Sequence, residues 1–351
     1  LAGARTKTAS PKALYFKTSV DMNGQGKDGK YHVPNEFTNR KCASSDDNWF
    51  KRFYTVRNLD GQNNTIYNLY CHSHAVSDGS YVAAFIYTAQ KGYDTVHKNL
   101  NFSNCCSVAP VVKGSNEDLS YGAIFIQHAG SDSAGSPRYT MENIHIYDSK
   151  VFALQHSGIL AGLLYNANAY NCSVNNCHIE NYICTQTKEP FVKKVTIAEN
   201  EIEISAEFYS YGEIGGLFGN IMRESNVVNC HVRGTTIHAY GEPDKEADMA
   251  SDGLLGKLAI ASAKGLGFFL VPGRHVSTMI GDIRTRDGET ITITGCTVDA
   301  ATRCTAEHQM HNSRYPYIGQ AYYIQFADTK GKVIVDGKEL TLADGNKNTK
   351  R

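Results

Sequence analysis

The sequence predicts an all-β solenoid, a fold in which short units stack along one axis. The first observation is a short apolar run containing small residues, which occurs five times along the 351 residues: at 81–86, 121–126, 158–164, 212–218 and 252–258. The central residues that we align as equivalent are Ala84, Ile124, Gly162, Gly216 and Gly256. The resulting steps are 40, 38, 54 and 40 residues, and a period in this range is typical of solenoids, propellers or arrays.

The second observation is that most of these runs are followed by alternating β-rich stretches that end near Asn-Cys or a similar polar pair. These stretches lie at 99–105, 141–146, 171–179, 225–232 and 290–298. Strands of about five residues, split by one or two polar residues, fit a sheet that bends at each Asn or Gly. Both residue types tolerate the left-handed backbone that such a corner needs.

Composition and charge narrow the possible partners. The apolar fraction of 41% is sufficient for a core, and Lys plus Arg equals Asp plus Glu at 35 each. A net charge of zero removes the main electrostatic argument for nucleic acid or an anionic membrane as partner. No apolar stretch approaches the roughly 20 residues that span a bilayer. No signal-peptide pattern is present, which fits either a cytosolic chain or the mature part of an exported one.

Along the chain, we expect a tail at 1–14, a repeat domain at 15–330, a hairpin or cap at 331–344 and a tail at 345–351. Strands are expected at 13–18, 53–57 and 65–70, with a tight turn at 60–64. Insertions are expected near 185–208, where 191–208 reads as one long strand, and at 241–252. Asp336-Gly337 between alternating apolar residues is a strong hairpin signal, and such a hairpin could cover the last repeat.

Three segments resemble a known family. Residues 21–24 (DMNG) and 59–69 (LDGQNNTIYNL) are similar to the opening of bacterial surface proteins with GLUG-type repeats, and 212–219 (GEIGGLFG) with 228–232 (VNCHV) is similar to their repeat unit. The resemblance covers roughly residues 15 to 300. It implies a right-handed parallel β-helix in a secreted or surface-anchored, adhesin-like protein, and it carries no catalytic residues. We therefore predict a right-handed parallel β-helix of about eight to eleven coils with a C-terminal hairpin.

Most of the ten cysteines are expected to be unpaired core residues rather than disulfides. Cys105, Cys177, Cys230 and Cys296 occupy similar positions before or within strand patterns, as buried small apolar residues would. On this interpretation Cys230→Ser places a hydroxyl in an apolar site at a cost of roughly 1 to 3 kcal/mol. A disulfide between Cys296 and Cys304 stays open as an alternative, since the two lie close in sequence.

Tyrosines near turns or strand ends are the candidate ligand-binding residues, because amphipathic rings suit contact with sugar or protein. The predicted set is Tyr165, Tyr170, Tyr209, Tyr211 and Tyr240. The alternative for each is a structural role at the edge of a repeat. Glu199, Glu201 and Glu203 form an acidic row on one strand face, with a spacing that glycoside hydrolysis permits, although a solvated outer face has the same pattern.

We expect no catalytic residues, no metal and no cofactor, because no motif for them rises above background. The predicted function is a secreted or cell-surface binding protein that recognises a glycan or a surface protein, or joins other subunits of a fibre or pilus. The alternatives are a carbohydrate-active β-helix enzyme, lyase or hydrolase, and a structural component of a phage or pilus. Residues 1–4 (LAGA) resemble the end of a lipoprotein signal with Ala in place of Cys, which leaves a lipid-anchored precursor open.

Overall fold

The computed structural model describes fifteen ranges of the chain: 13–22, 53–72, 74–75, 81–89, 93–109, 120–131, 137–153, 156–181, 191–197, 200–206, 213–239, 275–286, 288–306, 318–323 and 331–339. Every regular element in these ranges is a β-strand, which confirms the all-β prediction for them. No helix in this part of the chain is long and apolar enough to cross a membrane. The predicted insertion at 241–252 lies outside the described residues.

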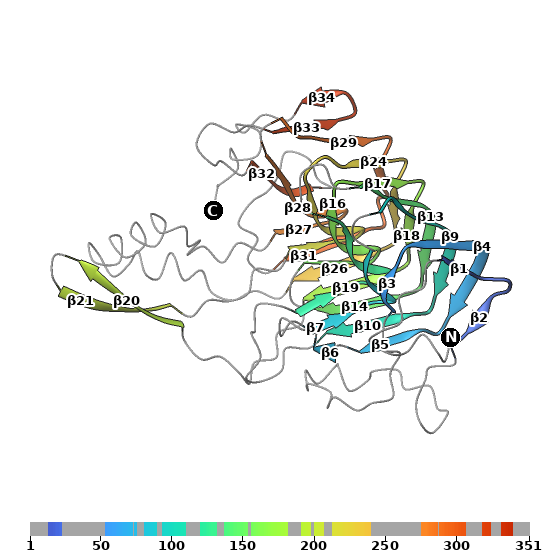
Figure 1. The fold of residues 1–351 in the computed structure, drawn as a ribbon, viewed down its shortest axis with the longest axis horizontal. Helices are drawn as coiled ribbons and strands as arrows, with labels where there is room; N and C mark the ends of the chain where they lie inside the picture. The colour runs from blue at the N-terminus through green and yellow to red at the C-terminus, as the bar shows by residue number, and fades with distance from the viewer. Residues whose placement is uncertain are drawn as a thin grey trace, which may run out of the picture.

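Three large sheets make up most of the fold (Figure 1). The thirteen-stranded sheet contains β1 (Ala13–Tyr15), β2 (Val20–Asp21), β4 (Asn58–Tyr67), β9 (Thr95–Ser103), β13 (Tyr139–Tyr147), β17 (Ala167–Tyr170), β18 (Ser173–Asn175), β24 (Asn226–Val228), β25 (His231–Arg233), β29 (Thr290–Thr294), β30 (Thr297–Val298), β33 (Lys332–Val335) and β34 (Lys338–Glu339). The six-stranded sheet contains β5 (Tyr70–His72), β10 (Cys106–Ala109), β14 (Lys150–Ala153), β19 (His178–Asn181), β26 (Thr236–Ala239) and β31 (Arg303–Ala306). The seven-stranded sheet contains β3 (Phe53–Val56), β8 (Ile86–Ala89), β12 (Ile126–Gly130), β16 (Ala161–Tyr165), β23 (Phe218–Met222), β28 (Ile280–Thr285) and β32 (Ile318–Tyr323).

Three smaller sheets complete the description. Two of them have three strands each: β6 (His74–Ala75), β7 (Tyr81–Ala83) and β11 (Ser120–Gly122) in one, and β15 (Ser157–Gly158), β22 (Glu213–Gly215) and β27 (His275–Ser277) in the other. The last is the antiparallel pair of β20 (Phe191–Ile197) and β21 (Asn200–Ala206). This pair corrects the single long strand expected at 191–208: the chain reverses after Ile197, and Ile197 pairs with Asn200.

The chain visits the three large sheets in a fixed order. β12, β13 and β14 belong to the seven-, thirteen- and six-stranded sheets respectively, and the order repeats at β16, β17–β18 and β19 and again at β23, β24–β25 and β26. We call each such circuit a pass. Pairing between neighbouring passes is parallel, between residues 28 to 67 positions apart in the sequence. Figure 1 shows the strands of successive passes lying side by side.

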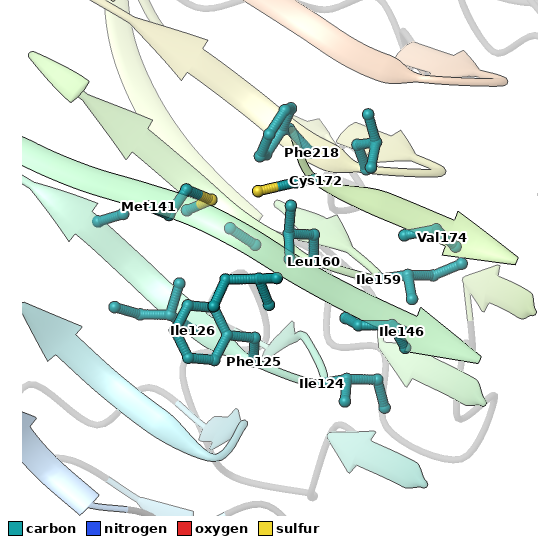
Figure 2. Close-up of a cluster of buried hydrophobic side chains, with 14 of the residues drawn as sticks. Ile124, Phe125, Ile126, Met141, Ile146, Ile159, Leu160, Cys172, Val174 and Phe218 are labelled. Carbon is teal, nitrogen blue, oxygen red and sulfur yellow. The ribbon is translucent and has the colours of Figure 1, made fainter. Parts of the chain in front are cut away.

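The four apolar runs that lie among the described residues form corners at the start of β8, β12, β16 and β23 of the seven-stranded sheet. Backbone hydrogen bonds connect the corners, from the Phe85 N–H to the Ile124 carbonyl and from the Ile124 N–H to the Ile159 carbonyl. Because Ile126 pairs with Ala161, the equivalent of Ile124 is Ile159 rather than Gly162, so the predicted alignment is wrong by three residues. Figure 2 shows these side chains packed in the core, with Ile124, Phe125, Ile159, Leu160 and Phe218 among them.

The last predicted repeat is also misplaced. Phe218 of β23 pairs with Ile280 of β28, so the residue aligned with Gly216 is Thr278 and not Gly256. Residues 252–258 lie outside the described residues. In the preceding unit, Ile214, Leu217, Val227, Cys230 and Val232 are fully buried, whereas Val228 is half-buried.

Residues at the second corner of the described passes adopt a left-handed backbone, and most of them are Asn, as the sequence predicted; Asp148, with φ of 49°, takes this position between Asn104 and Asn176. Asn68, Asn104 and Asn176 have φ of 54°, 54° and 52°, and Gly234 takes the next equivalent position with φ of 55°. Their side chains also bond from pass to pass. The Asn104 amide donates to Asn68 Oδ1 at 2.8 Å, and the Asn68 amide donates to Asp21 Oδ1 at 2.8 Å. These side-chain bonds add to the backbone hydrogen bonds between passes at the same bend, such as the Asn68 N–H to the Ser103 carbonyl at 3.0 Å.

The turn that the sequence predicted at 60–64 does not interrupt the strand. The turn expected at 60–64 is instead an irregularity inside β4, where the register with β9 shifts between Asp60 and Asn64. Gln62 and Asn63 take positive φ there, so the turn-forming residues produce a bulge without ending the strand.

The C-terminal hairpin is confirmed. β33 and β34 pair antiparallel across Asp336 and Gly337, whose φ angles are 47° and 78°.

The cysteines among the described residues are free thiols, as predicted, and the alternative of a Cys296–Cys304 disulfide is wrong. Cys105, Cys177 and Cys230 are buried and Cys296 is half-buried. Burial is the largest cause that raises the pKa of Cys105 and of Cys177 to about 12. These thiols are therefore protonated at neutral pH and are poor nucleophiles.

Buried thiol and hydroxyl groups form one column across the passes, and each of them hydrogen-bonds the backbone of its own strand and of a neighbouring strand. Cys177 Sγ donates to the Asn175 carbonyl at 3.2 Å and accepts from the Ser149 N–H at 3.4 Å. In the pass before, Ser149 Oγ donates to the Tyr147 carbonyl at 2.6 Å and accepts from the Cys105 N–H at 3.0 Å. In the pass after, Thr235 Oγ1 accepts from the Cys177 N–H at 3.3 Å. Each side chain thus satisfies its own strand and the neighbouring one.

Cys177→Ser should therefore change the free energy of unfolding by less than about 1 kcal/mol, since a hydroxyl already fills this role at Ser149. Cys177→Ala removes the acceptor of the buried Ser149 N–H and should cost about 1 to 3 kcal/mol. Urea denaturation of the two variants measures the difference. Equal losses in both would show that the thiol acts only as an apolar filler.

Candidate functional site

Aromatic side chains gather on the outer face of the seven-stranded sheet, and we take this group as the candidate site. Tyr87 of β8, His128 of β12 and Tyr165 of β16 follow one another across three neighbouring strands. The ring centroids of Tyr87 and His128 are 6.0 Å apart, and those of His128 and Tyr165 are 5.7 Å apart. All three residues are half-buried.

Two more rings extend this row to one side. Tyr121 of β11 lies 6.4 Å from His128, and its ring stacks on that of His156 at 5.3 Å with an interplanar angle of 26°. Both are half-buried. We call Tyr87, Tyr121, His128, His156 and Tyr165 the aromatic cluster. Tilted and stacked pairs at these distances are the favourable arrangements of aromatic rings.

The fold positions His156 through a buried glutamine. The Gln127 side chain is fully buried, and its Nε2 donates to the His156 carbonyl at 3.2 Å. Gly162 of the next strand makes room for it, because a Cβ there would overlap the Gln127 amide group. His156 itself has φ of 38°, a left-handed backbone that a non-glycine residue rarely adopts. The cluster is therefore held from below by Gln127 and Gly162.

The predicted tyrosines are only partly brought together. Tyr165 belongs to the aromatic cluster, but Tyr170 lies across a corner, at the end of β17 in the thirteen-stranded sheet, where it pairs with Glu142. Tyr209, Tyr211 and Tyr240 lie outside the described residues. The sequence analysis missed Tyr87, Tyr121, His128 and His156. Aligning the repeat at Ile86, Ile126 and Ala161 shows that an aromatic residue follows within one, two or four positions in these three units, although not at equivalent register positions.

The acidic row is described only through its backbone. Glu201 and Glu203 are two positions apart on β21 and pair with Thr196 and Lys194 of β20, and Glu199 lies outside the described residues. No group of three or more His, Cys, Asp or Glu side chains in the described ranges is arranged to hold a metal ion.

The aromatic cluster brings five aromatic rings together, each of which also carries a polar atom. Such a surface can stack against the C–H face of a sugar ring and hydrogen-bond its hydroxyls at the edges. Comparison with known proteins does not add a second line of inference: no family model, no curated protein and no solved structure matches this chain.

Proposed function

We propose that this chain is a secreted or cell-surface binding protein that recognises glycan through the aromatic cluster. The observation that carries the proposal is the row of Tyr87, His128 and Tyr165 on three neighbouring strands, with centroid distances of 6.0 and 5.7 Å. Rings at successive strand positions give an extended surface, which suits a chain of sugar units better than a single small molecule. The resemblance to adhesin-like surface proteins agrees with this function.

The proposal includes the finer architecture. We propose that the passes are the coils of a right-handed parallel β-helix of the GLUG-repeat type, with the hairpin of β33 and β34 at its C-terminal end. The parallel pairing and the repeated order of the three sheets support this. A solenoid offers long faces to which neighbouring coils each contribute residues, and β8, β12 and β16 each contribute one ring to the aromatic cluster.

Tyr165→Ala should weaken binding to a recognised glycan about tenfold, because it removes one ring from the contact surface. A glycan array first identifies ligands of the wild-type protein, and titration calorimetry then compares the variants. Tyr15→Ala is the matched control: Tyr15 is 62% exposed and lies on β1 of a different sheet, so it should bind as the wild type does.

Two results would contradict the proposal. The first is an array without any bound glycan, and the second is an equal loss of affinity in Tyr15→Ala and Tyr165→Ala. Release of new reducing ends or unsaturated products from the bound polysaccharide would show that the chain is an enzyme and not only a binding protein.

A further inference from the structure

The outer face of the thirteen-stranded sheet carries two columns of polar and aromatic side chains, one residue per strand. Along each strand these positions alternate with buried ones such as Ile146 and Val232. The first column, set by the strand register, is Thr65, Asn101, His145, Ser173, His231 and Thr297. The second is Asp21, Tyr67, Ser103, Tyr147, Asn175 and Arg233.

Three groups that can be cationic lie together in these columns. His145 Nδ1 is 2.8 Å from Ser173 Oγ, and His231 Nδ1 is 2.7 Å from Thr297 Oγ1, so each ring is held by a hydroxyl of the next strand. Burial lowers the pKa of His145, and the nearby charges of Arg233 and His231 lower it further. Burial and Arg233 likewise lower the pKa of His231. The three groups are therefore close enough to repel one another when charged.

Exposed aromatic rings lie beside these cations. Tyr67 and Tyr147 are 42% and 38% exposed, and both belong to the same column as Arg233. One strand, β9, separates them, which places their backbones about 9.6 Å apart at the usual strand spacing. That distance is comparable to the length of a disaccharide.

We propose that this face binds a linear polysaccharide that bears uronate carboxylates. Arg233, His145 and His231 supply positive charge to the carboxylates, and Tyr67 and Tyr147 supply ring faces to the sugars. These positive side chains complement the carboxylates of such a polymer, and the positions that carry them repeat from strand to strand. The site lies on a different sheet from the aromatic cluster, so it stands or falls independently of the proposed function.

Two carboxylates border this face, and both accept hydrogen bonds from neighbouring groups. Asp21 of β2 pairs with Tyr67 and accepts from the Asn68 amide at 2.8 Å. Asp299 follows Val298, which places it next to Arg233 in the strand register. Asp299 accepts hydrogen bonds from the Gly234 N–H at 3.0 and 3.1 Å and from Thr302 Oγ1 at 2.7 Å. Glu142 lies on β13 before the bend at Asn143, and Asp148 lies at the corner after Tyr147. β4, β9 and β18 contribute only neutral side chains to the two columns.

Acid pH should strengthen this binding. Both histidines have pKa values below the usual 6.5, so at neutral pH they are mostly uncharged and Arg233 carries the positive charge. A bound carboxylate favours the protonated rings, whereas the carboxylates of a uronate stay ionised at about pH 5. We therefore expect a higher affinity at about pH 5 than at about pH 8.

The probe is an oligogalacturonate, and its methyl ester is the uncharged control with the same sugar backbone. We expect the wild-type protein to bind the acid form more tightly at about pH 5 than at about pH 8 in titration calorimetry. Arg233→Gln should lower that affinity about tenfold at both pH values, because it removes a charge-assisted contact. The double variant His145→Gln and His231→Gln should bind equally at the two pH values.

Arg138→Gln is the matched control, since it removes the same charge from an exposed Arg whose Nη2 is 2.9 Å from Glu224. It should bind the oligogalacturonate as the wild type does, and unfolding midpoints within about 2 °C should show that all variants are folded. Equal binding of acid and methyl ester, equal losses in Arg233→Gln and Arg138→Gln, or no binding would overturn the proposal. Tighter binding of a sulfated polysaccharide of equal length would overturn the uronate assignment.

Discussion

Gly215→Ala should destabilise the fold by about 3 kcal/mol or more, a large part of the stability of a typical domain. A Cβ at this position of β22 would overlap the Phe218 carbonyl oxygen and would lie 2.6 Å from the Met279 carbonyl oxygen and 2.8 Å from the Gly281 nitrogen. All three contacts are backbone atoms of the neighbouring corner and pass, and they cannot turn away as the end of a flexible side chain would. Urea denaturation measures the change.

Gly288→Ala is the control. A Cβ there meets nothing within 4 Å, although φ is +73°, so the cost should stay at about 1 to 2 kcal/mol from backbone strain alone. If the two variants lose the same stability, close packing between passes is not the reason for glycine at 215. Wild-type stability in both variants would contradict the description of this corner.

The sequence predicts which kinds of element form better than it predicts which residues are equivalent from one unit to the next. The apolar runs are real units, and Asn104 and Asn176 take the left-handed corners expected of them. Gly162, however, was aligned as a corner residue when its role is to make room for Gln127 three residues later in the unit. A glycine can allow two backbones to approach closely, or it can leave room for a neighbouring side chain. The presence of Gly in the sequence does not show which of these two roles it has.

The candidate site depends on contacts between passes, which is why the sequence analysis found only Tyr165. Tyr87 and Tyr165 are 78 positions apart in the sequence, and His128 alone connects them among the described ring contacts. A register error of three residues is enough to hide this row. The cysteines show a similar limit: their burial was predicted, but their exchange with Ser149 and Thr235 as hydrogen-bonding groups depends on backbone N–H groups that only the fold brings near.

The second large effect is a loss of stability in acid that comes from His97. Its side chain is fully buried between two partners: Nε2 lies 3.0 Å from the Val56 carbonyl, and Nδ1 lies 3.0 Å from the Tyr139 hydroxyl. A carbonyl only accepts, so Nε2 carries the hydrogen and Nδ1 accepts from Tyr139. Both nitrogens are satisfied in the neutral ring. Burial lowers the pKa of His97 to about 4, and the Val56 carbonyl opposes this shift only in part.

The direction of this pH effect on stability follows from the number of protons that His97 binds in the folded and in the unfolded chain. Above pH 6.5 His97 is neutral in both the folded and the unfolded chain and does not affect stability. Between pH 6.5 and about 4 the unfolded chain binds a proton that the folded chain does not, so stability falls with falling pH. From these two pKa values, His97 should cost about 2 kcal/mol on going from about pH 7 to about pH 5.

His97→Gln tests this directly, because Gln can still donate to the Val56 carbonyl but does not titrate. The variant should be less stable than the wild type at about pH 7, since its shape differs from that of the ring packed between Phe125 and Tyr139. Its loss between about pH 7 and about pH 5 should be smaller than that of the wild type by about 2 kcal/mol, measured by urea denaturation. His145→Gln, which changes a half-buried ring on the outer face, should retain most of the acid sensitivity of the wild type. If His97→Gln loses as much stability in acid as the wild type, the buried imidazole is not the group that titrates.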